Sequence, residues 1–168
     1  MNIRIRNEAP ADAPAIEAVT AAAFLDAEHS SHTEQFIVNA LRRAGQLSVS
    51  LVAEDAGQIV GHVAISPVRI SDDSLGWYGL GPVSVAPGHQ ALGIGKRLVN
   101  EALTELRDMG ASGCVVLGDP AYYGRFGFVA MPALVYPGVP AQYFQALLLA
   151  GAMPSGTVSY RAAFEATA

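Results

Sequence analysis

The sequence predicts a mixed α/β sandwich that forms a single domain over residues 1–168. Three observations predict it. The length of 168 residues fits one domain, since domains commonly hold about 100–200 residues. Hydrophobic residues make up 51% of the chain and charged residues only 15%, which indicates a well-filled interior and excludes disorder. Segments with the alternating pattern of strands and segments with helical periodicity also follow one another along the chain.

The first elements are a strand and two helices. Ile3 and Ile5 alternate with arginines, which is typical of a strand with one buried face. Asp12, followed by a proline two residues later, predicts the start of a helix. A second helix is predicted to begin near Ser31, which with Glu34 forms a capping box, and to end at Gly45. The expected buried residues of the two helices are Ile16, Val19 and Ala23, and then Phe36, Ile37, Ala40 and Leu41.

Three antiparallel strands are predicted next, at residues 48–54, 59–70 and 75–85, joined by polar turns at 55–58 and 71–74. A glycine-rich loop after Pro87 then opens a helix that ends at Gly110, and a buried strand follows at 113–118. Strand, helix and strand in this order form a right-handed βαβ unit, so 75–85 and 113–118 should run parallel. A helical turn at 120–125, proline-rich connections at 132–140 and strands at 144–149 and 157–160 complete the chain.

Composition and charge exclude several classes of function. The chain has 10 Lys and Arg against 15 Asp and Glu, a net charge of −5, which argues against general binding of nucleic acids or membrane surfaces. A single cysteine, Cys114, excludes an intramolecular disulfide and a thiolate zinc cluster, and it is interpreted as a buried strand residue. Acidic residues interrupt the N-terminal region, and the apolar stretch 144–153 is shorter than the ~20 residues of a membrane span. We expect a cytoplasmic monomer or homodimer without membrane partners.

The glycine-rich loop between residues 86 and 97 is the most informative segment. Backbone N–H groups of such a loop, together with the start of a helix, can hold an anion such as pyrophosphate. A Walker loop would need glycine at Gln90 and Ser or Thr at Arg97, and a dinucleotide fingerprint would need glycine at Leu98, so both interpretations fail. If the loop is considered without any other motif, the alternative is that it only starts the helix and binds no ligand.

Two separated motifs resemble one enzyme superfamily. The run Val-x-Val-x-Pro-x-x-Gln-x-x-Gly-x-Gly, residues 83–95, resembles the acyl-CoA signature of the GNAT N-acyltransferases. Gly-Asp-Pro-Ala-Tyr-Tyr-Gly-Arg-Phe-Gly-Phe, residues 118–128, resembles its second half, and together with "LGPVSV" and "YFQALLL…GTVSY" it is most similar to the YhbS-like branch. The resemblance implies a mostly antiparallel central sheet with helices on both faces, whose parallel fourth and fifth strands splay apart to admit CoA.

The resemblance also implies the residues of the site. Val83 and Val85 would bond the pantetheine arm in the manner of an added strand, and the Val83 N–H would stabilise the oxyanion. Pro82, which has no N–H, leaves room for a bulge where the strands diverge. Tyr123 stands at the family position that protonates the leaving thiolate, whereas Tyr122, Phe126 and Phe128 are interpreted as packing residues. The expected cofactor-binding residues are Val83, Ser84, Val85, Gln90, Ala91, Leu92, Gly93, Ile94, Gly95 and Lys96.

No single residue stands out as the general base. His62, Glu34, Asp119 and water are the alternatives; the first three are also explained as a core histidine, a helix cap and a turn residue. The family's frequent asparagine is replaced by Asp119 and its neighbours. His29 and His32 have the spacing of metal ligands but lack a third fixed ligand, so we expect no metal and interpret residues 28–34 as an acceptor-site loop.

The function predicted from this resemblance is an acyl-CoA-dependent N-acetyltransferase. It would use acetyl-CoA as co-substrate and transfer the acetyl group to a small-molecule or peptide primary amine, by direct attack through a ternary complex. The alternative is a non-catalytic acyl-CoA-binding or sensing module, which would release no thiol from acetyl-CoA in response to amines. A Ser-His-Asp hydrolase is disfavoured because the sequence contains no Gly-x-Ser-x-Gly elbow.

Overall fold

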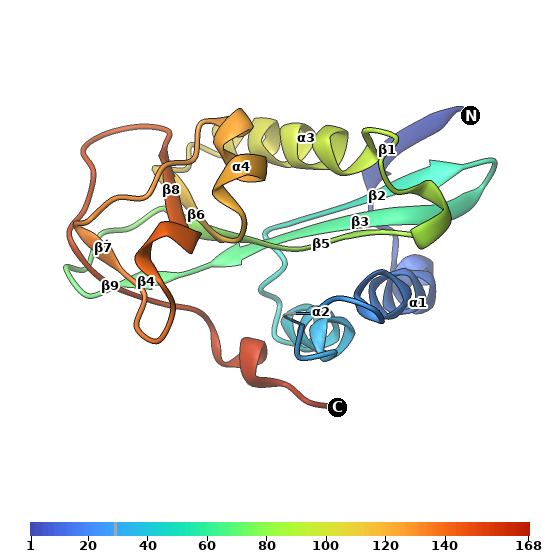
Figure 1. The fold of residues 1–168 in the computed structure, drawn as a ribbon, viewed down its shortest axis with the longest axis horizontal. Coiled ribbons are helices and arrows are strands. Elements are labelled where there is room, and N and C mark those ends of the chain that lie inside the picture. Colours follow the sequence, from blue (N-terminus) through green and yellow to red (C-terminus); the bar gives the residue numbers. More distant parts are fainter. Residues whose placement is uncertain (29) are drawn as a thin grey trace.

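A six-stranded sheet forms the centre of the molecule, with the spatial order β1-β2-β3-β5-β6-β8 (Figure 1). The structure is a computed structural model and describes residues 1–28 and 30–168. Neighbouring strands of this sheet are antiparallel except β5 and β6, which run parallel as predicted. The strands are β1 (Ile3–Asn7), β2 (Val49–Asp55), β3 (Gln58–Pro67), β5 (Trp77–Val85), β6 (Gly113–Leu117) and β8 (Phe144–Leu148).

A second, three-stranded sheet with the order β4-β9-β7 differs from the prediction in two places. The strand expected over 59–70 is divided: β3 ends at Pro67, and β4 (Arg69–Ile70) pairs instead with β9 (Gly156–Ser159). The proline has no N–H for the ladder, and Ile70 then packs into a separate core with Trp77. The proline-rich connection also contains a strand that the sequence did not reveal, β7 (Leu134–Val135).

Helices cover both faces of the central sheet, as predicted. Helices α1 (Ala13–Phe24) and α2 (Glu34–Arg43) lie on one face, and α3 (Ile94–Asp108) and α4 (Pro120–Tyr123) lie on the other (Figure 1). The main core fills the space between α3 and the sheet, and a smaller core of Ile16, Val38 and Val52 lies under α1 and α2. The core-facing residues of α3 are those that helical spacing selects, namely Leu98, Val99, Ala102, Leu103 and Leu106.

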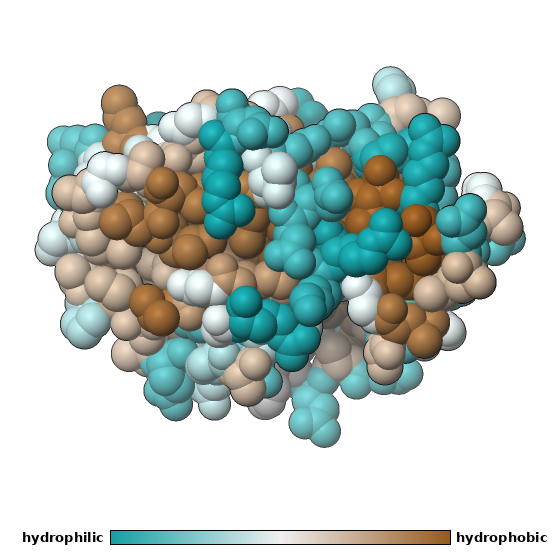
Figure 2. Space-filling view, turned by 90° about the horizontal axis from the view of Figure 1, so that it is seen from above, coloured by the Kyte–Doolittle hydropathy of each residue, from teal (hydrophilic) through white to brown (hydrophobic). Residues whose placement is uncertain are grey.

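Figure 2 shows the molecule from the side of α3, with hydrophilic side chains across the middle of this face. The exposed charged residues of α3 are Lys96, Arg97, Glu101, Arg107 and Asp108. No helix within residues 1–28 and 30–168 is long and apolar enough to cross a membrane.

The start of α2 differs from the predicted capping box. The helix begins at Glu34 after Thr33, whose carbonyl accepts the first helical bonds from the N–H groups of residues 36 and 37. The carboxylate of Glu34 instead accepts hydrogen bonds from the hydroxyls of Ser30 and Ser31, so the Ser31 hydroxyl does not cap the helix. The helix therefore starts later than the sequence pattern indicated.

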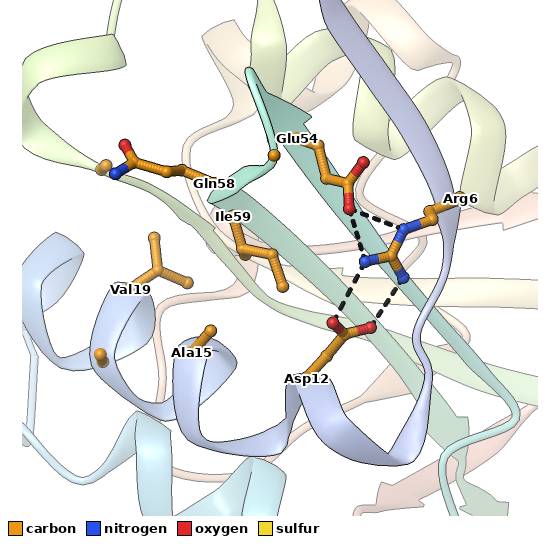
Figure 3. Close-up of a pocket in the computed structure, with 10 residues that line it drawn as sticks. Arg6, Asp12, Ala15, Val19, Glu54, Gln58 and Ile59 are labelled. Carbon is orange, nitrogen blue, oxygen red and sulfur yellow. Dashed lines mark hydrogen bonds and ion pairs between the residues drawn. The ribbon is translucent and has the colours of Figure 1, made fainter.

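An ion-pair cluster fixes the start of α1 against the sheet (Figure 3). The Arg6 guanidinium on β1 lies 2.7 Å from a carboxylate oxygen of Asp12 and 2.6 Å from one of Glu54 on β2. Hydrogen bonds from Arg6, followed by one from the Ala9 N–H, hold the pKa of Asp12 below its ordinary value of 3.8. This cluster positions α1, and the far end of α1 borders the cleft described next.

Candidate active site

A cleft opens where β5 and β6 part. The two strands pair only through Trp77 with Gly113, Tyr78 with Cys114, and Gly79 with Val115. On the other side of β5, the pairing with β3 shifts register between Val63, opposite Val83, and Ile65, opposite Leu80. Gly81 and Pro82 lie opposite the single residue Ala64, so β5 has one extra residue here and the bulge expected at this proline is present.

The free edge of β5 presents backbone groups to this cleft. The Ala86 N–H donates to the Val60 carbonyl of β3 at 2.8 Å, which fixes the direction of the backbone at this end of the strand. Because backbone groups of successive strand residues point to alternate sides, those of Val85 and Val83 point away from β3 and toward the cleft. The Val85 carbonyl accordingly accepts a hydrogen bond of 3.1 Å from the side-chain amide of Gln90.

Two adjoining cavities lie along this edge. One, of about 250 Å³, is bounded by the end of α1, by β5 and by α4; the other, of about 330 Å³, lies at the start of α3. Both are lined by Val85, Gln90, Gly95 and Tyr122, so they lie side by side along the path from the start of α3 to Tyr123. A larger groove of about 520 Å³ beside Arg6 contains none of the predicted site residues (Figure 3).

The start of α3 presents free backbone N–H groups and positive charge to the cleft, an arrangement that can hold an anion. The Arg97 N–H bonds back to the Gly93 carbonyl, so the N–H groups of the three residues before it have no intrahelical acceptor. Gly93 has φ +82°, a conformation that favours glycine. A Cβ on Gly95 would lie 3.1 Å from the Tyr122 hydroxyl oxygen, so any larger residue there would crowd the cavity lining. Lys96 and Arg125 add positive charge to the lining.

Both tyrosines of α4 line the smaller cavity. Burial raises the pKa of Tyr123 to about 12, so its hydroxyl stays protonated at neutral pH. Its ring lies against Gly118, where a Cβ would come within 2.4 Å of Cε2, and packs edge-on against Phe128. Tyr122 packs edge-on against Phe126, as expected, and it also borders both cavities beneath the Arg125 guanidinium. Phe128 is buried in the core, as expected.

Most of the predicted cofactor-binding residues line these cavities, but two do not. The Ser84 side chain is buried outside both cavities, and Leu92 is 54% exposed on the surface. Arg125 could have been noticed as a cation within the second motif, whereas the α1 residues are brought to the cleft by tertiary packing alone. The lining residues that the sequence analysis missed are Ala23, Phe24, His89, Tyr122 and Arg125.

The structure separates the candidate bases. Glu34 is bound by the hydroxyls of the preceding loop, and Asp119 accepts a hydrogen bond of 2.9 Å from the Ala121 N–H, as a turn residue would. His62 is fully buried, with Nε2 2.8 Å from the Ser50 hydroxyl. His29 lies outside the described residues, and among residues 1–28 and 30–168 no group of three or more His, Cys, Asp or Glu side chains could hold a metal. Cys114 is buried in its strand, as expected.

Comparison with known proteins agrees with this geometry. The family model described as acetyltransferase (GNAT) domain matches residues 4–131. The chain belongs to the GNAT acetyltransferase family. The enzyme class predicted from the sequence, an acyl-CoA-dependent acetyltransferase, is thereby confirmed, and so is the predicted mixed sheet of the family fold.

Relatives place this GNAT protein in the YhbS-like branch, as predicted. It is 42% identical to the N-acetyltransferase YhbS of Escherichia coli K12 over 125 residues, which are 74% of this chain and 72% of YhbS. A GNAT acetyltransferase from Brucella melitensis, solved in complex with acetyl-CoA, is 50% identical with a TM-score of 0.87 and covers 97% of this chain and 98% of its own. Escherichia coli YhbS solved with CoA has 36% identity, a TM-score of 0.86, and coverage of 98% and 93%.

Proposed function

We propose that this GNAT protein transfers an acetyl group from acetyl-CoA to a primary amine by direct attack within a ternary complex. The observation that carries the proposal is the path from the start of α3 to Tyr123, which runs along the unpaired edge of β5. The Brucella melitensis enzyme, at 50% identity over nearly the whole chain, was solved with acetyl-CoA, which supports the choice of co-substrate.

The lining of the path fits the parts of CoA. The free N–H groups of Ile94, Gly95 and Lys96 suit the pyrophosphate, and the positive charges of Lys96 and Arg125 suit phosphate groups. The pantetheine arm would add to the edge of β5 as a strand does, through the backbone groups of Val83 and Val85. Its thiol end would then reach the smaller cavity.

Acyl transfer to an amine requires that the protein stabilise the oxyanion, protonate the leaving sulfur and admit the amine. The Val83 N–H would stabilise the negative charge that develops on the thioester oxygen, in the role of an oxyanion hole. Tyr123 would protonate the sulfur as it leaves. The amine would enter beside Ala23 and Phe24 at the end of α1, which form the wall of the smaller cavity away from α4. Direct attack needs both substrates bound at once.

A panel of primary amines with acetyl-CoA tests the proposal. Free thiol should appear only when an acceptor is present, and mass spectrometry should find the amine heavier by one acetyl group. Initial rates at varied concentrations of both substrates should give intersecting lines, as a ternary complex requires. Parallel lines, or thiol release that no amine increases, would contradict the proposal.

A further inference from the structure

A buried polar chain lies under α1 and α2, on the face of the sheet opposite α3. His62 on β3 stands directly between Val52 of β2 and Ser84 of β5. Directly opposed residues share a face of the sheet, and Val52 packs against α1 and α2, so His62 and Ser84 face these helices too. Ser84 separates Val83 from Val85, the two residues whose backbones face the cleft.

The hydrogen bonds of this chain fix the tautomer of His62. Burial raises the pKa of Glu8, but hydrogen bonds from Arg42 and Ser50 outweigh it, so the pKa lies below its ordinary value and the carboxylate is ionised. An ionised carboxylate only accepts, so the one hydroxyl proton of Ser50 goes to Glu8. The Ser50 oxygen, 2.8 Å from Nε2, must then accept the Nε2–H of His62.

Because the proton of the neutral His62 ring is on Nε2, Nδ1 is unprotonated and can accept a hydrogen bond or a proton. Nδ1 has no hydrogen-bond partner within the described protein, and neither has the hydroxyl of Ser84 opposite it. Both side chains are at most 1% exposed. Buried polar atoms are rarely left without partners, and one water between two such atoms can satisfy both. Both groups lie on the face of the sheet toward α1, and the end of α1 borders the smaller cavity.

We propose that His62 accepts the proton of the attacking amine through Ser84 and water, with Ser50, Glu8 and Arg42 holding it in the Nε2–H tautomer. The proposal rests on the proposed function. As the amine nitrogen bonds to the carbonyl carbon it becomes cationic and acidic; its proton passes to water while a water proton passes to Nδ1. The imidazolium keeps its Nε2–H on Ser50 and faces Glu8, whose carboxylate oxygen lies 3.9 Å from Nε2. The proton returns to solvent by the same path after product leaves.

The charges around His62 set its pH range. Burial lowers its pKa to about 4; Glu8, from the segment after β1, raises it, and Arg42 of α2 lowers it. The buried residues of α1 are Ile16, Val19 and Thr20; none is charged, and the Thr20 hydroxyl bonds its own helix. His62 is therefore neutral and able to accept a proton above about pH 5, so its own titration adds no limb to the rate profile between pH 6 and 9.

The test compares His62→Gln with Ser66→Ala, a variant that removes another buried, unpartnered hydroxyl from the same strand. With an acceptor from the amine panel, His62→Gln should lose about 10²–10⁴-fold in turnover at pH 7 while its affinity for CoA changes little. The ratio of wild-type to variant rates should also fall by up to about tenfold per pH unit, because hydroxide must now take the proton in the variant. Ser66→Ala should match the wild type in both respects.

Two results would overturn the proton path. A purely structural role of His62 would lower the rate by the same factor at every pH, so a wild-type to His62→Gln rate ratio that does not change with pH contradicts the proton path. Nitrogen NMR of labelled histidine should show Nε2–H at neutral pH, and an Nδ1–H tautomer would also contradict it. If no amine of the panel is acetylated, the proposed function is overturned, and the proton path that rests on it is overturned too.

Discussion

Replacing Tyr123 by phenylalanine removes one oxygen atom from the cleft and leaves the ring in place. The ring packs edge-on against Phe128, with centroids 6.0 Å apart, and against Tyr122 at 5.0 Å. These contacts survive the substitution, so the fold and the affinity for acetyl-CoA should change little. Turnover should fall because nothing then protonates the leaving thiolate.

The size of the loss follows from the pKa of the hydroxyl. Burial raises the pKa of Tyr123 to about 12, whereas a thiol in water has a pKa of about 8.5. Complete proton transfer to an unperturbed thiolate would thus be uphill by about 3.5 units, or about 4.8 kcal/mol. A hydrogen bond to a charged group contributes about 1.5–3 kcal/mol, which is about 10–150-fold in rate. General acid catalysis gives about 10²–10⁴-fold, so the two ranges meet near 10²-fold, the loss we expect.

Stopped-flow measurement of thiol release, with acceptor and acetyl-CoA saturating, isolates the chemical step. The ratio of wild-type to variant rates should stay constant from pH 6 to 9, because a hydroxyl with a pKa near 12 does not titrate there. Tyr122→Phe is the matched control, since it removes the neighbouring hydroxyl from the same cavity. Near-wild-type turnover in Tyr123→Phe, or a larger loss in Tyr122→Phe, would refute the reasoning.

Three further predictions follow from the packing and chemistry. Gly118→Ala should displace the Tyr123 ring, since the new Cβ would lie 2.4 Å from Cε2, and turnover should fall; Gly124→Ala, with no heavy atom within 4 Å, should keep it. Activity should survive EDTA, because direct transfer to an amine needs no Lewis acid; loss with EDTA and recovery with zinc would contradict this. Arg6→Met should lower the free energy of unfolding by about 1 kcal/mol at pH 7 in urea titrations. Arg6 holds the pKa of Asp12 below 3.8, so the difference in unfolding free energy should be fully present above pH 3.8 and should shrink as the pH falls through the lowered pKa. A difference that does not shrink at any pH below 3.8 would contradict this.

Local patterns predicted the elements that build the cleft. The glycine-rich loop and the buried face of α3 could be predicted from a short stretch of sequence, because residue spacing and turn-forming residues define them locally. Tyr123 of α4 was singled out in the same way, from a motif, whereas its neighbour Tyr122 was not assigned to the cleft. The division of the apolar run 59–70 between two sheets was missed, because its periodicity does not say which strand each half pairs with.

The parts of the site made by distant residues could not be predicted. Phe24 reaches the cleft only because α1 packs across the sheet. The environment of His62 depends on Glu8 and Arg42, which lie 54 and 20 residues before it in the sequence. The sequence shows that His62 lies between apolar residues. Its tautomer, however, follows from the hydrogen bonds among His62, Ser50 and Glu8, which only the fold brings together.

Calorimetric titration of acetyl-CoA tests most directly the claim that the cleft between β5 and β6 is the co-substrate site. The wild type should bind, and a folded Gly95→Glu variant should not, because its side chain would enter the space beside the Tyr122 hydroxyl and bring a negative charge to the phosphates. Gly88→Glu adds the same charge to the same loop at a glycine with no heavy atom within 4 Å, and it should bind as the wild type does. Unchanged affinity for acetyl-CoA in Gly95→Glu would contradict the assignment.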